Sequence, residues 1–301
     1  MPTLLITGGS GFFAWNAWRE LAECGYKVVL TSRMPAKVAS IPGAPQTVGL
    51  EIVDQAEVAA VLSSVRPDVV VHAGALAQPS ECESNHLRTR EVNVVGSSNV
   101  FSVCTALGVP FIFMSTDLVY DGRKGNYSED DDAHPVLEYG RSKRELEVAL
   151  SKQQLFPLWS IVRSSLMFDN PTPWNEGYPG FATEALLRGE ETTLFTDQYR
   201  TPVYVKDVAR GIDSIVRGKL YGQVFNIGGP ERINRVEFVR RFCRVAGIDD
   251  SKIRELSQED VPGYVTKVAD VSLNSRRLME QSDWRPTPLI AAFESMLQEY
   301  A

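Results

Sequence analysis

The chain has 301 residues, of which 44% are hydrophobic and 23% are charged, as expected of a globular protein with one large core or two smaller ones. Its net charge of −7 argues against a nucleic-acid partner, because neutralising phosphates requires a basic surface. There is neither an apolar run of the roughly 18–20 residues that a membrane span needs nor the basic start of a signal peptide. We therefore expect a cytoplasmic protein with no membrane partner.

Strands and helices are predicted to alternate through the first half of the chain. Short Val-, Ile- and Leu-rich runs predict buried strands within residues 3–7, 27–32, 46–54, 68–74, 110–116 and 158–165. Helices are predicted at 14–24, 55–65, 85–107 and 139–153. Continuous apolar strands joined by helices indicate an α/β fold with a Rossmann-type, doubly wound parallel sheet.

The alternation weakens after residue 166, where Pro, Gly, Asn and aromatic residues accumulate. We therefore predict a dinucleotide-binding domain over 1–166, to which 203–226 returns. A smaller α/β substrate-binding domain is predicted over 167–301, mainly from 167–202 and 227–301. The run 233–247 predicts an amphipathic helix whose arginines lie on a solvated face.

The stretch TGGSGFF directly follows the first predicted strand. Gly8 allows the sharp turn from strand to helix, and Gly11 lets a pyrophosphate approach the main chain at the positive end of that helix. We predict that Gly8, Ser10 and Gly11 bind a dinucleotide. Phe12 and Phe13 either line the same pocket or pack in the core.

The end of the second predicted strand bears on the choice of cofactor. NAD-binding proteins usually carry an acid there, whereas this chain has Ser32 and Arg33. An arginine can pair with a 2′-phosphate, so we predict that NADP(H) is preferred over NAD(H). Lys37 is a second candidate for this contact, and a solvated surface arginine is the alternative explanation of Arg33.

Tyr139 and Lys143 are four residues apart on a predicted helix and therefore share a face. A neighbouring ammonium favours the phenolate, so we expect Lys143 to lower the pKa of Tyr139. Ser115, Thr116 and Asp117 end the fifth predicted strand, at the edge of the sheet where ligands bind. The two hydroxyls either bind a ligand there or cap the strand end.

With these motifs the chain resembles the extended short-chain dehydrogenases/reductases, and most of all the dTDP-4-dehydrorhamnose reductase family. That family also includes the regulatory β subunit of methionine adenosyltransferase. TGGSGFF, GLEIVD, PDVVVHAGALAQPSECE, REVNVVGSSNV, STDLVYDG, EYGRSK, RTPVYVKDVA and FNIGG occur in the family's order.

The resemblance implies a role for individual residues. The catalytic residues would be Thr116, Tyr139, Lys143 and Asn93, the last completing a proton relay. The cofactor would also contact Glu51, Ile52, Ala73, Gly74, Ala75, Ser115, Tyr139, Lys143 and Ser164, with Arg163 and Ser165 near its amide. The substrate would contact Asp117, Leu118, Leu166, Trp174 and Arg200.

The implied activity is NADPH-dependent reduction of a keto group, on a nucleotide-linked 4-keto-6-deoxy sugar. One alternative is an NADP(H)-binding regulatory subunit, and another is an extended reductase that acts on a ketone without a nucleotide. Leu118 and Leu166 stand where the family usually has Tyr and Trp facing the sugar. Because Leu118 also replaces the Glu of the 4,6-dehydratases, we do not expect dehydration.

Other features leave alternatives open. Arg200 is either a phosphate contact or a structural residue, and Trp174, Tyr178 and Phe181 either cover the substrate or pack. The acidic run 129–134 predicts a solvated loop, with a Mg site as the alternative. The four dispersed cysteines and three histidines show no ligand spacing, so we predict no metal site. A homodimer is common among such enzymes.

Overall fold

A seven-stranded sheet forms the centre of the molecule. The computed structural model describes residues 1–153, 155–261 and 268–300. Its main sheet has the strand order β11-β6-β5-β4-β1-β2-β3, and each neighbouring pair is parallel. These strands are β1 (Thr3–Thr7), β2 (Lys27–Ser32), β3 (Gln46–Gly49), β4 (Val69–His72), β5 (Phe111–Thr116), β6 (Trp159–Ser164) and β11 (Gln223–Ile227). The predicted α/β class with a doubly wound parallel sheet is confirmed.

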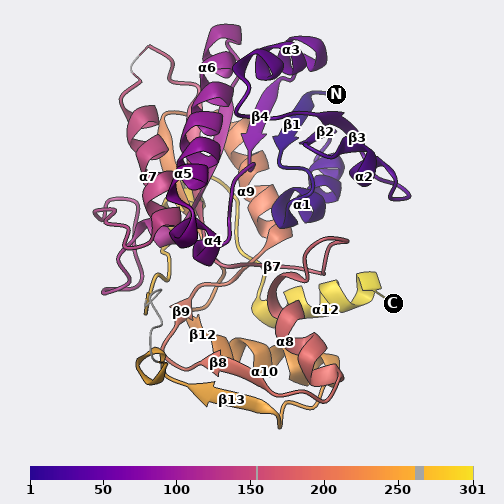
Figure 1. Ribbon diagram of the computed structural model, residues 1–301, viewed down its shortest axis with the longest axis vertical. Coiled ribbons are helices and arrows are strands. Elements are labelled where there is room, and N and C mark those ends of the chain that lie inside the picture. The colour runs from indigo at the N-terminus through magenta and orange to yellow at the C-terminus, as the bar shows by residue number, and fades with distance from the viewer. Residues whose placement is uncertain (154, 262–267, 301) are drawn as a thin grey trace.

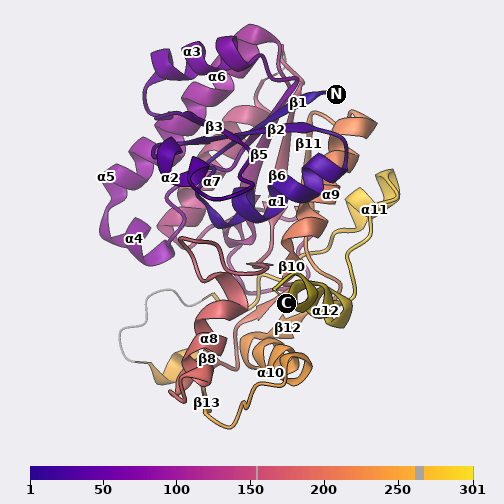
Figure 2. The same ribbon diagram turned by 90° about the vertical axis from the view of Figure 1, so that its right-hand side faces the viewer.

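Helices cover both faces of this sheet (Figure 2). One face packs against α1 (Phe12–Glu23), α2 (Pro35–Ala39), α9 (Val205–Gly218) and α11 (Arg276–Gln281). The other packs against α3 (Gln55–Val65), α6 (Ser97–Leu107) and α7 (Glu138–Ser151). Burial on both faces explains why the strands read as uninterrupted apolar runs.

The predicted helix at 85–107 forms in three parts. These are α5 (His86–Thr89), a π-helical stretch at Arg90–Gly96, and α6. The short helix α4 (Pro79–Ser84), which was not predicted, precedes them. A π-helical turn inside a longer helix is often found at a functional site.

The remaining elements form a smaller unit below the sheet (Figure 1). Its helices are α8 (Gly177–Leu187), α10 (Arg235–Ala246) and α12 (Leu289–Tyr300). Its strands pair in twos: β7 (Met167–Phe168) with β10 (Val203–Tyr204), β8 (Thr192–Phe195) with β13 (Ile253–Leu256), and β9 (Tyr199–Arg200) with β12 (Ile233–Asn234). The rings of Phe168, Phe238 and Phe293 meet at the centre of its own apolar core.

The last part of the chain contributes to both cores. Leu278 of α11 and Trp284 are buried in the main core, with residues of α1 and α9. The indole nitrogen of Trp284 donates to the carbonyl oxygen of Asp207 at 2.8 Å. The chain therefore returns to the main sheet a second time, before α12 enters the smaller unit.

The strand order reverses between β1 and β4, since the chain runs outward from β1 to β3 and then crosses to β4. In open α/β sheets, ligands bind at the carboxyl ends of the strands on either side of such a reversal.

Within the part of the chain that the structure describes, no helix combines the length and apolar character that crossing a bilayer requires.

Candidate active site

The turn between β1 and α1 is built from glycine for steric reasons. Gly8 has a φ of +78°, and a Cβ on it would lie 2.9 Å from the Cα of Gly74. The chain after β1 and the chain after β4 therefore touch where a larger residue would separate them. Gly11 is the N-cap of α1, so the first backbone N–H groups of this helix face the same point.

A buried polar chain fixes the loop that follows β4. The hydroxyl of Thr7 accepts from the backbone N–H groups of Ala73 and Gly74 at 3.1 and 3.0 Å and lies 2.7 Å from Nδ1 of His72. The Nε2 atom of His72 lies 2.8 Å from the hydroxyl of Ser97. Burial, with a smaller effect of Lys143, lowers the pKa of His72 to about 3, so the ring is neutral. Sequence reasoning missed this positioning role of Thr7 and His72.

A hollow opens beside this glycine turn, at the reversal of strand order. Residues predicted to bind the cofactor line it: Gly8, Ser10, Gly11, Ser32, Arg33, Glu51, Ile52, Ala73, Gly74 and Ala75. Val92 from the π-helical stretch also lines it and was not predicted. Arg33 is exposed at the rim, whereas the side chain of Phe13 is buried in the main core. Phe13 therefore packs in the core and does not line the hollow.

A second cleft is lined by residues of the main sheet and of the smaller unit, and Phe12 in its lining directly follows Gly11 of the hollow. The predicted residues Phe12, Ser115, Thr116, Asp117, Leu118, Tyr139, Ser164, Leu166 and Arg200 line it. Tyr178, which was expected either to cover the substrate or to pack, also lines it. Arg235 lines it as well and was not predicted. Trp174 lines a different hollow and packs edge-on against Trp15, with ring centroids 5.0 Å apart. Phe181 is exposed on α8.

Helix α7 lies very close to the end of β5. The turn Asp117–Val119 follows β5, and a Cβ on Gly140 would collide with the carbonyl oxygen of Leu118. Glycine at this position therefore permits the contact that brings Tyr139, its neighbour in α7, into the cleft with Thr116. The hydroxyl of Thr116 also accepts from the backbone N–H of Leu118 at 3.2 Å, so it caps the turn as well.

The lowered pKa expected for Tyr139 is wrong for this structure. Burial, followed by the charges of Cys82 and Asp117, raises the pKa of Tyr139 above its ordinary value. The Nζ atom of Lys143 donates to the carbonyl oxygen of Met114 at 2.9 Å and lies 5.9 Å from the centroid of the Tyr139 ring. Burial also lowers the pKa of Lys143 to about 8. Burial is therefore the largest cause of both pKa shifts.

Asn93 lies between α7 and the loop after β4. It is fully buried, and its amide nitrogen donates to the carbonyl oxygen of Leu76 and the hydroxyl of Ser142, both at 3.0 Å. Its amide oxygen accepts from the backbone N–H of Leu76 at 2.8 Å. In this structure Asn93 therefore joins α7 to the loop after β4.

A buried ion pair lies beneath the cleft. Glu147, one turn after Lys143 on α7, accepts from the hydroxyl of Ser115 at 2.6 Å and from Arg163 at 3.0 and 2.8 Å. Arg163 in turn donates to the hydroxyl of Tyr120 at 2.7 Å. Arg163 therefore supports the site from below, and it is not among the residues that line the cleft. Its pairing could not be read from sequence spacing.

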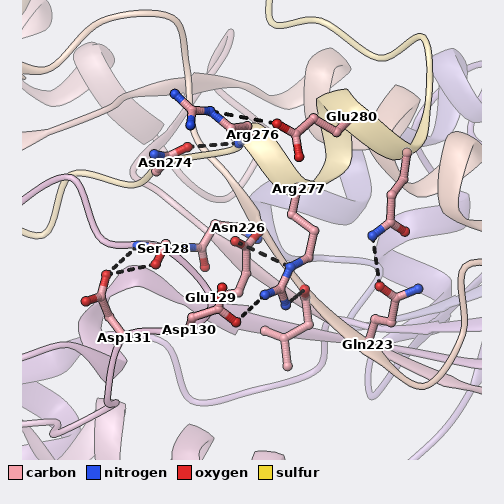
Figure 3. Close-up of polar contacts among 12 residues, drawn as sticks. Ser128, Glu129, Asp130, Asp131, Gln223, Asn226, Asn274, Arg276, Arg277 and Glu280 are labelled. Carbon is pink, nitrogen blue, oxygen red and sulfur yellow. Dashed lines mark hydrogen bonds and ion pairs between the residues drawn. The ribbon is translucent and has the colours of Figure 1, made fainter.

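The acidic run 129–134 is a loop in which Asp130, Asp132 and His134 are exposed, as predicted, whereas the side chain of Glu129 is buried. The carboxylate of Glu129 is almost completely buried and accepts from the backbone N–H of Asn226 at 2.7 Å. Figure 3 shows Arg277 reaching from α11 to Asp130, and Asp131 turned back onto Ser128. Among the described residues, no three His, Cys, Asp or Glu side chains are grouped so as to hold a metal ion.

Comparison with known proteins places this geometry in a family. The model of the RmlD substrate binding domain matches residues 2–301. The chain is 28% identical to the probable low-salt glycan biosynthesis reductase Agl14 of Haloferax volcanii, over 85% of this chain and 84% of the relative. It is 26% identical to the spore coat polysaccharide biosynthesis protein SpsK of Bacillus subtilis, over 99% and 98%. It is 24% identical to the methionine adenosyltransferase 2 subunit beta of Xenopus laevis, over 94% and 84%.

Solved structures share the fold. The dTDP-4-dehydrorhamnose reductase of Bacillus anthracis, solved in complex with NADP, superposes with a TM-score of 0.86 at 20% identity and covers 99% of both chains. A hypothetical dTDP-4-dehydrorhamnose reductase of Sulfolobus tokodaii superposes with a TM-score of 0.79 at 26% identity, covering 96% of this chain and 98% of that one. The resemblance identified from the sequence motifs is thereby confirmed.

Proposed function

This chain belongs to the RmlD substrate binding domain family, and from its two clefts we propose that it is an NADPH-dependent reductase. Its substrate would carry a keto group, most suitably on a nucleotide-linked 4-keto-6-deoxy sugar. The observation that carries this proposal is that Tyr139 and Thr116 line one cleft together with Phe12, which directly follows Gly11 of the glycine-lined hollow.

The residues of the hollow fit a dinucleotide. The contact between Gly8 and Gly74 leaves backbone, without side chains, facing the space where a pyrophosphate would lie. Arg33 is exposed at the rim beside the buried hydroxyl of Ser32, and both would hold a 2′-phosphate. When bound here, NADPH supplies the hydride for reduction.

Tyr139 is the proton donor in this proposal. Because burial raises its pKa, the phenol holds its proton at neutral pH, and that is the form needed to protonate a ketone oxygen during reduction. The hydroxyl of Thr116 donates to the carboxylate of Asp117 at 3.2 Å in this structure. It would turn from Asp117 to donate a hydrogen bond to the ketone oxygen as negative charge develops there.

Lys143 would act on Tyr139 through its charge, since it does not itself line the cleft. With a pKa of about 8 it remains largely an ammonium at pH 7, and it lies 5.9 Å from the Tyr139 ring. After proton transfer, this positive charge would stabilise the phenolate. The ion pair of Glu147 with Arg163 would hold α7 against β5, so that Tyr139 and Thr116 keep their relative positions.

The apolar side chains of Leu118 and Leu166 lie in the same cleft as Tyr139. They suit the methyl group of a 6-deoxy sugar better than a hydroxymethyl group, because neither can satisfy a buried hydroxyl. Neither leucine can move a proton, so reduction remains the proposed reaction rather than elimination.

The test is NADPH oxidation with a panel of 4-keto-6-deoxy sugars linked to dTDP, UDP and GDP. At least one should be reduced, and Tyr139→Phe should lower kcat about 10²- to 10⁴-fold while leaving NADPH affinity intact. If the unmodified protein binds NADPH but reduces none of the panel, the proposed nucleotide-sugar activity is wrong.

A regulatory role is the second candidate, since the methionine adenosyltransferase 2 subunit beta of Xenopus laevis aligns over 94% of this chain. It would be supported by NADPH binding without turnover together with co-purification of a larger synthetase. The reductase proposal is the stronger one, because it accounts for a tyrosine and a threonine placed together in the cleft.

A further inference from the structure

Two arginines from the smaller unit line the cleft that holds Tyr139. Arg200 lies in β9, and Arg235 is the first residue of α10. Sequence reasoning left Arg200 as either a phosphate contact or a surface or structural residue, and it placed the arginines of α10 on a solvated face. The structure contradicts that placement for Arg235, because this side chain is half-buried and faces the cleft.

Arg200 is engaged within the protein. Its side chain is almost fully buried, and one terminal nitrogen donates to the carbonyl oxygen of Tyr199 at 2.7 Å and lies 3.4 Å from those of Val268 and Ala269. Its Nε atom is 3.7 Å from the carboxylate of Asp117. The charge of Arg200 is therefore balanced, and its donors point at backbone.

Arg235 is held differently. Its Nε atom donates to the amide oxygen of Gln198 at 2.7 Å, and Gln198 is a neutral partner. Across the described residues, no carboxylate lies within ion-pair distance of Arg235. Its guanidinium also lies over the ring of Tyr178, 5.2 Å from the centroid.

The partner of Arg235 is itself fixed. Gln198 is buried, and its amide nitrogen donates to the amide oxygen of Gln258 at 3.0 Å. Gln258 is also buried, and its amide nitrogen donates to the carbonyl oxygen of Asp197 at 3.3 Å. Two buried glutamines thus orient the guanidinium without cancelling its charge.

We propose that Arg235 binds the diphosphate of a nucleoside diphosphate-linked substrate, and that Gln198 is its positioning residue. A half-buried guanidinium without a carboxylate partner favours an anionic ligand, and its planar fork matches two phosphate oxygens. The nucleotide nature of the ligand rests on the proposed function, whereas the anion site rests on the contacts of Arg235. This assignment moves the phosphate contact from Arg200 to Arg235.

The experiment compares the affinity of each nucleoside diphosphate with that of its uncharged nucleoside. Calorimetric titrations with dTDP, UDP and GDP, and with thymidine, uridine and guanosine, are run on the cofactor-free protein and repeated with NADP⁺. At least one diphosphate should bind tenfold or more tightly than its nucleoside. Arg235→Gln should lower the affinity for that diphosphate about 10- to 150-fold, as expected for the loss of a charge-assisted contact. It should leave the affinity for the nucleoside unchanged.

Arg241→Gln is the matched control. Arg241 lies on the same helix, where it pairs with Glu231 and Glu237 away from the cleft. This variant should retain the full affinity for the diphosphate. Arg235→Lys should recover part of the loss, because it restores the charge without the fork.

Gln198→Leu tests the positioning role. It should weaken the diphosphate by less than Arg235→Gln does, and it should not change nucleoside binding. The proposal is overturned if no diphosphate binds better than its nucleoside, or if Arg235→Gln leaves that difference intact or weakens both ligands equally. Since binding is read without turnover, a failed NADPH assay would overturn the reductase and leave this result standing.

Discussion

Replacing Asp169 with asparagine should change how the stability of the protein depends on pH. Asp169 directly follows β7, where the chain leaves the main sheet for the smaller unit. It is 3% exposed, and one carboxylate oxygen accepts from the backbone N–H of Asn170 at 2.7 Å. The other oxygen has no hydrogen-bond partner among the described residues.

This environment disfavours the charged form of Asp169. Burial raises its pKa from 3.8 to about 7, with repulsion from Glu299 and Glu20 adding to the effect and Lys206 opposing it. The folded protein therefore keeps a proton, between about pH 4 and pH 7, that the unfolded chain has released. The stability contributed by this proton is fully present below pH 4 and is lost as the pH rises through about 7.

The size of the effect follows from the pKa. At about 1.4 kcal/mol for each pKa unit, a rise from 3.8 to about 7 corresponds to a loss of about 4 kcal/mol between pH 4 and pH 8. Asp169→Asn cannot ionise, so it should escape this loss. Its new N–H group costs about 1–3 kcal/mol if it stays unpaired, and that cost does not depend on pH. The free energy of unfolding of the variant, relative to that of the wild type, should therefore rise by about 4 kcal/mol between pH 4 and pH 8.

Urea unfolding followed by circular dichroism at several pH values between 4 and 8 measures this difference. Asp283→Asn is a suitable control, because Asp283 is exposed and its replacement should change stability by less than about 0.5 kcal/mol at each pH. A stability difference between Asp169→Asn and the wild type that stays constant over this range would refute the reasoning.

The other predictions concern the cofactor, the cleft and the ion pair beneath it. Arg33→Asp should weaken NADPH about 10- to 150-fold and leave NADH unchanged or tighter, as read by fluorescence titration; equal affinities of the unmodified protein for the two cofactors would contradict the assignment. Thr116→Val should lower kcat by less than Tyr139→Phe, since it removes one hydrogen bond rather than the proton donor, and steady-state kinetics on a reduced substrate would check this order. Glu147→Gln should destabilise the fold by about 3–5 kcal/mol in urea unfolding, because it leaves Arg163 without its carboxylate, and adding Arg163→Met should recover most of the loss; a cost below about 1 kcal/mol would show that the pair matters little.

Much of the fold could be predicted because its signals are local. The apolar runs of the strands, the glycine turn at Gly8 and the four-residue spacing of Tyr139 and Lys143 each depend on a few neighbouring residues. The handedness of the crossovers makes a doubly wound sheet the expected arrangement once strands and helices alternate. These same signals located the hollow and most of the residues that line the cleft.

The charge state and partners of the site residues depended on the tertiary structure. Lys143 faces the carbonyl oxygen of Met114, and Asn93 bonds to Ser142, because α7 packs against β5 and the π-helical stretch. The proposal of Arg235 rather than Arg200 as the phosphate contact depends on which carboxylate, amide and carbonyl groups surround each guanidinium. Such contacts join residues far apart in the chain, and the burial that shifts a pKa is a property of the assembled core. Residue spacing along the chain carries neither kind of information.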